Sequence, residues 1–182
     1  MIRTALLSLA LLANTAGAEV LTRLDPANSR IDFTYKQMGV ALEGRFAAIS
    51  GRVAFDPAKP QTARATIEVK LASVDTGLDE ANSEVAGKDW FNTAAFPLAR
   101  FEATAVKPLG GNRYQVDGRL TIKGRSQNVS LPATFTPDAG GGSFAGTFSL
   151  RRADFAIGEG DWRDFNVVAN EISVRFKLRI TR

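Results

Sequence analysis

The feature that most constrains this chain is a period-two alternation of apolar and polar residues, which returns in eight short stretches. The last stretch shows it most clearly, with single polar residues between Ile172, Val174, Phe176, Leu178 and Ile180. Successive side chains of a strand point to opposite faces, so each stretch has one apolar face and one face in water. Because almost no helix is available to cover the apolar face, the sheet has to cover itself as a barrel or a sandwich.

We predict an all-β fold: an eight-stranded antiparallel, lipocalin-like barrel with one short capping helix. A closed barrel of about eight strands is just wide enough to be filled by its own side chains or to hold one small ligand. The functional question is therefore whether the interior is full or occupied.

The first eighteen residues have the layout of a secretory signal peptide. Arg3 gives a charged start, an apolar run follows, and Ala16 and Ala18 form a small-residue cleavage site. The run is too short to cross a bilayer, which takes about 20 apolar residues. We expect cleavage after Ala18, a single domain over residues 19–182 and a periplasmic location.

Two residue types that support much enzyme chemistry are absent, since the sequence has no Cys and no His. Without them there is no thiol, no imidazole general base and no ordinary zinc or haem ligand set.

The formal net charge is only +4, and the Lys and Arg residues are scattered rather than clustered. A nucleic-acid site needs a basic stripe. We expect no nucleic-acid partner, no metal, no cofactor and no catalytic residues.

Breaks in the alternation predict where strands bend and turn. The apolar phase changes around Ala47 and Ala48, which predicts a bulge or bend of the kind that small barrels need at corners. Gly124 separates two alternating runs and predicts a hairpin. Residues 25–28 have turn chemistry and are expected to precede the first strand.

Only one segment has helical spacing. Leu78, Ala81 and Val85 share a face, acidic residues near the start suit the helix dipole, and Gly87 is a suitable stop. The segment lies in a long connection between strands, and long ordered loops are often functional. We expect it to cap one end of the barrel, either as a gate or as a plug over the core edge.

Several segments resemble, in the same order, those of the YceI-like family. They are residues 74–77, residues 89–92 with 96–97 and 101–102, residues 118–124 and residues 152–158. The third reads Gly-Arg-Leu-Thr-Ile-Lys-Gly, and the fourth is close to the family's Arg-x-Asp-Phe-Gly-Ile-Gly segment. The resemblance covers nearly all of residues 19–182. It implies an extended lipocalin-like barrel, exported, that binds a long isoprenoid or other amphiphile inside.

Two positions depart from the family pattern. Many family members carry a His near the first strand and another near the central helix, and this chain has neither. Ala156 stands where the family has Gly after its Asp-Phe pair. The first departure weakens the expectation that an imidazole recognises a ligand head group, and it leaves the apolar interior unaffected.

The inward positions combine aromatic rings with small residues, which are Gly44, Gly51, Ala65, Ala103, Ala105, Gly118, Ala133 and Gly146. A barrel filled by its own side chains sets large residues against small ones at crystal-like density. So many small residues leave room for a ligand, unless neighbouring rings fill it. We expect the following residues to contact the ligand: Phe33, Tyr35, Phe46, Trp90, Phe91, Phe101, Leu120, Phe135, Phe148, Phe155, Trp162 and Phe176.

The function expected from these features is the holding of a polyisoprenoid, quinone-like or fatty lipid for transport, storage or sequestration. One alternative is a periplasmic interaction or stress-response module with a filled barrel, which contacts inner-membrane proteins transiently or dimerises through a barrel edge. A second alternative is a carboxylate-dependent enzyme, because Asp154, Glu159, Asp161 and Asp164 lie close together in the chain. A raised carboxyl pKa in a cleft would favour the enzyme.

Overall fold

The structure is a computed structural model and describes residues 20–182. The predicted signal peptide and its cleavage site lie outside the described residues. One antiparallel sheet runs in the order β3-β4-β6-β7-β8-β9-β10-β1-β2-β5. Its strands are β1 (Arg23–Gln37), β2 (Val40–Phe46), β3 (Ile49–Ala54), β4 (Arg64–Lys70), β5 (Val74–Asp75), β6 (Leu98–Gly110), β7 (Arg113–Ile122), β8 (Arg125–Asp138), β9 (Gly141–Arg151) and β10 (Glu171–Thr181).

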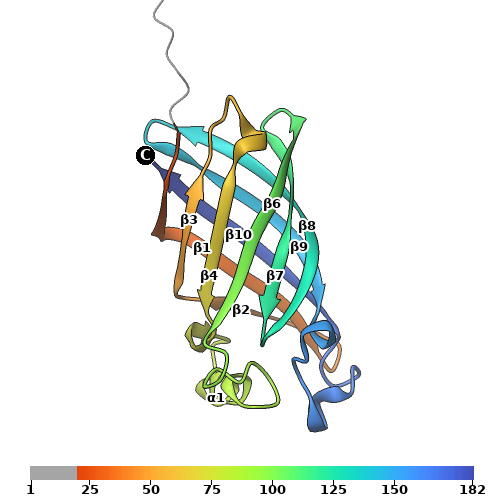
Figure 1. Ribbon diagram of the computed structural model, residues 1–182. Helices are drawn as coiled ribbons and strands as arrows, with labels where there is room; N and C mark the ends of the chain where they lie inside the picture. Colours follow the sequence, from red (N-terminus) through yellow and green to blue (C-terminus); the bar gives the residue numbers. More distant parts are fainter. Residues whose placement is uncertain (1–19) are drawn as a thin grey trace, which may run out of the picture.

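The sheet curls until its two ends meet (Figure 1). Leu21, just before β1, and Phe55, just after β3, exchange two backbone hydrogen bonds of 2.8 and 2.9 Å. At the opposite end of the barrel, β2 pairs with the short strand β5 through Phe46 and Val74. The lipocalin-like barrel predicted from the alternation is therefore confirmed.

The ten strands correspond to the eight predicted stretches. β2 and β3 are one stretch, which leaves the ladder at Ala47 and Ala48, so that β2 pairs with β1 while β3 pairs with β4. The predicted bend at these two residues is confirmed. The two-residue strand β5 is the remaining addition, and it follows β4 after one turn of 3-10 helix over Leu71–Ser73.

The hairpin predicted around Gly124 joins β7 to β8 through a two-residue turn. Lys123 and Gly124 have φ angles of 49° and 73°, which is the left-handed geometry that matches the twist of paired strands. The turn expected at residues 25–28 is wrong as a strand boundary, because β1 begins at Arg23 and runs through it. These residues form a bulge instead, in which the Ser29 hydroxyl accepts a 2.9 Å hydrogen bond from the Arg179 amide.

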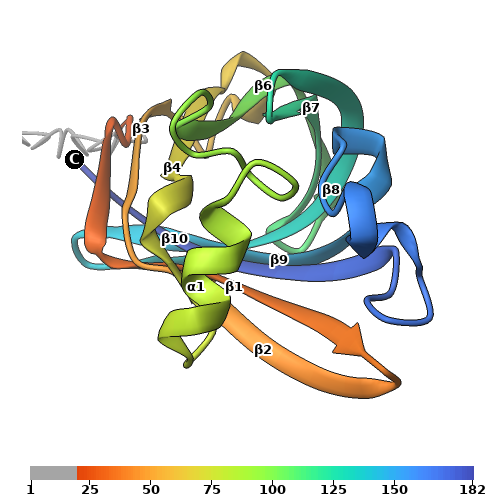
Figure 2. The same ribbon diagram turned by 90° about the horizontal axis from the view of Figure 1, so that it is seen from below.

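The helix α1 (Asp79–Ala86) is followed by Gly87, as the spacing predicts. It lies at one end of the barrel with residues 87–97 and residues 152–170, and the C-terminus lies at the other end (Figure 1). Seen along the barrel, α1 and the loop after it cross the opening (Figure 2). These three segments are called the cap below, and the opposite end of the barrel is called the far end.

Two buried clusters occupy the two ends of the barrel. The far-end cluster centres on Phe55, which is 2% exposed, and includes Tyr114, Phe135 and Ile180. The cap-end cluster includes Leu71, Trp90 and Phe155. Within residues 20–182, no helix is long and apolar enough to span a membrane.

Candidate functional site

A cavity of about 600 Å³ runs through the barrel and reaches the cap. All five inward residues of β10 line it, from Ile172 to Ile180. Residues from α1 and the cap loops complete the lining, among them Ala81, Val85 and Ile157. The volume falls within the range of about 300–1,000 Å³ that small-molecule sites occupy, and the lining is overwhelmingly apolar.

Pairs of glycine and phenylalanine shape the wall of the cavity. Phe33 lies directly across the ladder from Gly44, and Phe176 lies directly across from Gly146. In both pairs the ring covers the glycine so closely that an added Cβ would overlap it. The Phe101 ring covers Gly118 in the same way. These rings lie against the wall because glycine has no side chain, which leaves the centre of the barrel open.

Six of the eight small residues predicted to leave room fall into two groups, and the other two, Gly51 and Ala105, do not line the cavity. A register shift between Ala103 and Ala105 changes which residues of β6 face inward, so that Val106 lines the cavity in place of Ala105. Rings occupy the space over Gly44, Gly118 and Gly146. Ala65, Ala103 and Ala133 line the cavity directly. The neighbouring rings thus fill part of the space, and the alanines keep the rest open.

Most of the predicted ligand contacts line this cavity: Phe33, Tyr35, Phe46, Trp90, Phe91, Phe101, Leu120, Phe148, Trp162 and Phe176. Phe135 and Phe155 are not among the lining residues. Phe135 is 3% exposed and packs against Phe55 and Phe144 in the far-end cluster. Phe155 is 1% exposed and belongs to the cap-end cluster.

Arg152 holds the cap together and was not predicted as a site residue. It is 1% exposed, and its guanidinium donates five hydrogen bonds to backbone carbonyls of residues 157–169. Five is the full donor capacity of a guanidinium. The group also lies between two aromatic rings, 5.5 Å from the Trp90 centroid and 5.1 Å from the Phe165 centroid. The loop over residues 152–170 is therefore wrapped around one buried cation that also borders the cavity.

Further contacts join the parts of the cap to one another and to the barrel. The Asp89 carbonyl accepts backbone hydrogen bonds from Gly158 and Glu159, at 2.9 and 2.8 Å. The buried Lys123 ammonium donates to the Ala156 carbonyl at 2.7 Å and to the Glu159 carboxylate at 3.0 Å. The cap is thus anchored to the β7–β8 hairpin as well as to itself.

Ala156 ends the 3-10 helix over Arg152–Phe155 with φ 54° and ψ 37°. This is the left-handed region, which glycine adopts without steric cost and alanine does not. The position where the family pattern has Gly is therefore one at which the backbone favours it.

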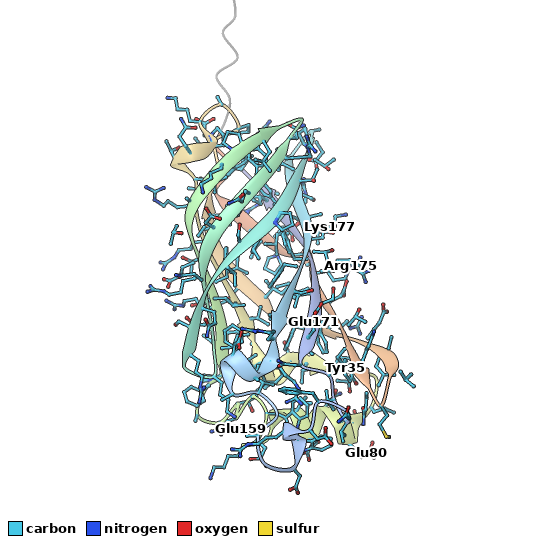
Figure 3. All side chains as sticks on the ribbon, turned by 90° about the vertical axis from the view of Figure 1, so that its right-hand side faces the viewer. Tyr35, Glu80, Glu159, Glu171, Arg175 and Lys177 are labelled. Carbon is cyan, nitrogen blue, oxygen red and sulfur yellow. The ribbon has the colours of Figure 1, made fainter. Side chains whose placement is uncertain are left out.

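Polar side chains that border the cavity gather toward the cap. Gln37, Thr76, Glu80 and Glu84 are among the lining residues, and burial raises the pKa of Tyr35. Figure 3 shows Glu80 and Tyr35 toward this end, and Arg175 and Lys177 farther along β10. Besides Arg152, two arginines border the cavity, but Arg64 donates to the carbonyls of Thr62 and Ala63, and Arg100 pairs with Glu68.

The four carboxylates considered for catalysis do not line the cavity. Asp154 pairs with Arg151 at 3.0 Å, and Asp164 accepts from the amide and side chain of Asn166. The Lys123 hydrogen bond holds the pKa of Glu159 below its ordinary value. A lowered carboxyl pKa is the opposite of what a general acid needs near neutral pH. In residues 20–182, no group of three or more acidic residues is placed to hold a metal.

The fold and the cavity define a class of protein: a lipocalin-like antiparallel barrel with an apolar, capped interior. The model of the YceI-like domain matches residues 23–180, so the chain belongs to the YceI-like family. Sequence relatives agree with this assignment. A UPF0312 protein of Pseudomonas savastanoi pv. phaseolicola is 34% identical over 134 residues, which are 70% of each chain. One from Shewanella putrefaciens is 30% identical over 163 residues, which are 85% of each.

Solved structures share the architecture. Burkholderia cenocepacia BcnA is 40% identical, with a TM-score of 0.83 over 86% of this chain and 98% of that one. A polyisoprenoid binding domain from Saccharophagus degradans is 19% identical, with a TM-score of 0.70 over 90% and 99% of the two chains. The second likeness establishes the fold alone.

Proposed function

We propose that this protein binds one long apolar lipid of the polyisoprenoid, quinone-like or fatty type inside its barrel, for transport, storage or sequestration. The observation that carries the proposal is the capped apolar cavity of about 600 Å³. The name of the Saccharophagus degradans domain, a polyisoprenoid binding domain, is consistent with this ligand class.

Burial of hydrocarbon is enough to drive such binding. Each buried CH₂ contributes about 0.8 kcal/mol, so a chain of many carbons offsets the cost of association without any charged contact. The walls supply aliphatic and aromatic surface from every long strand of the barrel, and no His, Cys or metal is required for this binding.

The first experiment is mass spectrometry of the solvent extract from purified protein, with native mass spectrometry for stoichiometry. We expect one lipid per chain, of polyprenyl or other long-chain type. An apo mass that does not change when polyprenyl lipids are added would overturn the proposal and favour an interaction module with a filled barrel.

A matched pair of variants on β6 tests whether the lipid binds inside the barrel. Ala103 lines the cavity, and its neighbour Thr104 is exposed on the outer face of the same strand. Ala103→Trp places a large ring in the cavity and is expected to abolish lipid copurification. Thr104→Trp adds the same ring outside the barrel and is expected to leave lipid copurification unchanged. A folded Ala103→Trp protein with full lipid content would place the ligand elsewhere.

We also propose that the protein is exported to the periplasm with cleavage after Ala18. The charged start, short apolar run and Ala-x-Ala site support this. Amino-terminal sequencing of protein from the periplasmic fraction tests it: a mature chain starting at Glu19 is expected, and an uncleaved chain in the cytoplasm would refute it.

A further inference from the structure

The two tryptophans of the chain lie side by side in the cap and differ in one respect. Their ring centroids are 5.4 Å apart, and both residues line the cavity. Trp162 Nε1 donates a 2.8 Å hydrogen bond to the Glu84 carboxylate of α1. Trp90 Nε1 is buried and has no hydrogen-bond partner within residues 20–182.

The charged group over the Trp90 ring does not supply an acceptor. The residue is 9% exposed, and its ring is next to the Arg152 guanidinium, which is itself a donor with its hydrogen bonds directed at backbone carbonyls. A buried N–H without an acceptor carries a desolvation penalty, and such groups are rare in native structures. Trp90 is a wall residue of the cavity, so a ligand that fills the cavity lies against the same side chain, and a small rotation of the indole would bring the buried N–H to it.

The charges near Trp90 limit what that acceptor can be. Glu80 and Glu84 border the same end of the cavity, and their carboxylates disfavour an anionic group there. The nearby guanidinium disfavours a cationic one. An uncharged oxygen, such as that of a carbonyl, ester or ether, suits both.

We propose that Trp90 Nε1 donates a hydrogen bond to an uncharged acceptor oxygen at one end of the bound lipid. The ligand then lies with its polar end under the cap and its hydrocarbon tail toward the far end, where Phe144 and Ile180 line the cavity. This inference rests on the proposed function and adds to it an orientation, a recognition residue and a class of end group.

The test uses two probe lipids with the same tail: geranylgeranylacetone, which ends in one ketone, and the hydrocarbon in which that ketone is replaced by methylene. A ¹H–¹⁵N spectrum of labelled protein contains one indole N–H signal per tryptophan, hence two. The Trp162→Phe variant assigns them. We expect the Trp90 indole proton to shift downfield on addition of the ketone and not on addition of the hydrocarbon.

A matched pair of substitutions gives an independent readout. Trp90→Phe keeps a ring over Arg152 but removes the donor, and should lower the ratio of ketone to hydrocarbon affinity about tenfold. Trp162→Phe also alters the cavity wall, so it should change the affinity for both probes alike; because its donor already has a protein acceptor, the ratio should stay unchanged.

The outcomes separate the two proposals. If both probes bind, but the Trp90 signal responds equally to them or the affinity ratio survives Trp90→Phe, the hydrogen bond is refuted and the lipid-binding function stands. If neither probe binds, the lipid-binding function fails and this inference fails with it. If the Trp90→Phe variant does not fold, the ¹H–¹⁵N spectra of the protein with Trp90 intact, recorded with each probe, decide whether the hydrogen bond forms.

Discussion

The buried guanidinium of Arg152 predicts a large and specific loss of stability when it is replaced by lysine. An ammonium has three donors, so at least two of the five carbonyls lose their partner in Arg152→Lys. Hydrogen bonds to charged groups contribute about 1.5–3 kcal/mol each, which gives a loss of about 4 kcal/mol in the free energy of unfolding. For a domain of this size that corresponds to a fall in Tm of roughly 8–16 °C.

The neighbouring Arg151 provides the control. Its side chain is 68% exposed and pairs with Asp154, so Arg151→Lys should change the free energy of unfolding by less than about 0.5 kcal/mol. Urea denaturation followed by tryptophan fluorescence measures both variants, and hydrogen exchange at the Ile157 and Val168 amides detects opening of the cap alone. If Arg152→Lys loses less than about 1 kcal/mol and leaves exchange in the cap unchanged, the guanidinium does not organise this loop.

Three further predictions concern stability. Lys107, Gln115 and Ser130 donate to Asp117 and lower its pKa to about 2, so the stabilisation is complete above the ordinary value near 3.8 and is lost as the pH falls through the lower one. The difference in Tm between the native protein and Asp117→Asn should therefore shrink between pH 5 and pH 2, and a constant difference would contradict the assignment. Ala156→Gly relieves a left-handed alanine and should raise the free energy of urea unfolding by about 0.5–1 kcal/mol; a loss would show that the alanine is unstrained. Phe55→Ala removes the central ring of the far-end cluster and should lower the same free energy by about 3–5 kcal/mol, whereas a loss below 1 kcal/mol would mean that the cluster repacks.

The strands of this barrel were predictable because period-two alternation reports directly which face of a strand is buried. The whole inward set of β10 lines the cavity as the alternation requires, and the phase change at Ala47 and Ala48 marks a real bend. Helical spacing and a following Gly87 were likewise sufficient for α1. Each of these signals is local in the sequence.

The position of each inward residue along the barrel axis was not predictable. Alternation shows which face of a strand a residue lies on, but not how far along the axis it lies. Phe135 has the correct parity for the cavity, but it lies at the far end against Phe55. Which ring covers which glycine depends on strand register, which the alternation determines only to within steps of two residues, so that the turns have to fix the rest.

The chemistry of the cap was also missed. A lone arginine usually indicates a solvated surface, and the five carbonyls around Arg152 converge only after the loop folds. The run of glycines and acidic residues after Arg152 was the only local sign of tight turns there, and it pointed equally to an exposed loop.

The glycine–phenylalanine pairs have a consequence for how the internal diameter of this barrel can change during evolution. Gly44, Gly118 and Gly146 are not among the residues that line the cavity, but each one lets a ring lie flat against the wall. At Gly44 one extra carbon would meet only the Phe33 ring, so it would push that ring inward and narrow the cavity without altering a lining residue. At Gly118 and Gly146 an extra carbon would also overlap a backbone carbonyl, of Glu102 and Pro132, so the strands would have to shift as well. Relatives with identical inner walls can therefore differ in the thickness of ligand they admit, and glycines behind the wall are the positions at which to look for that difference.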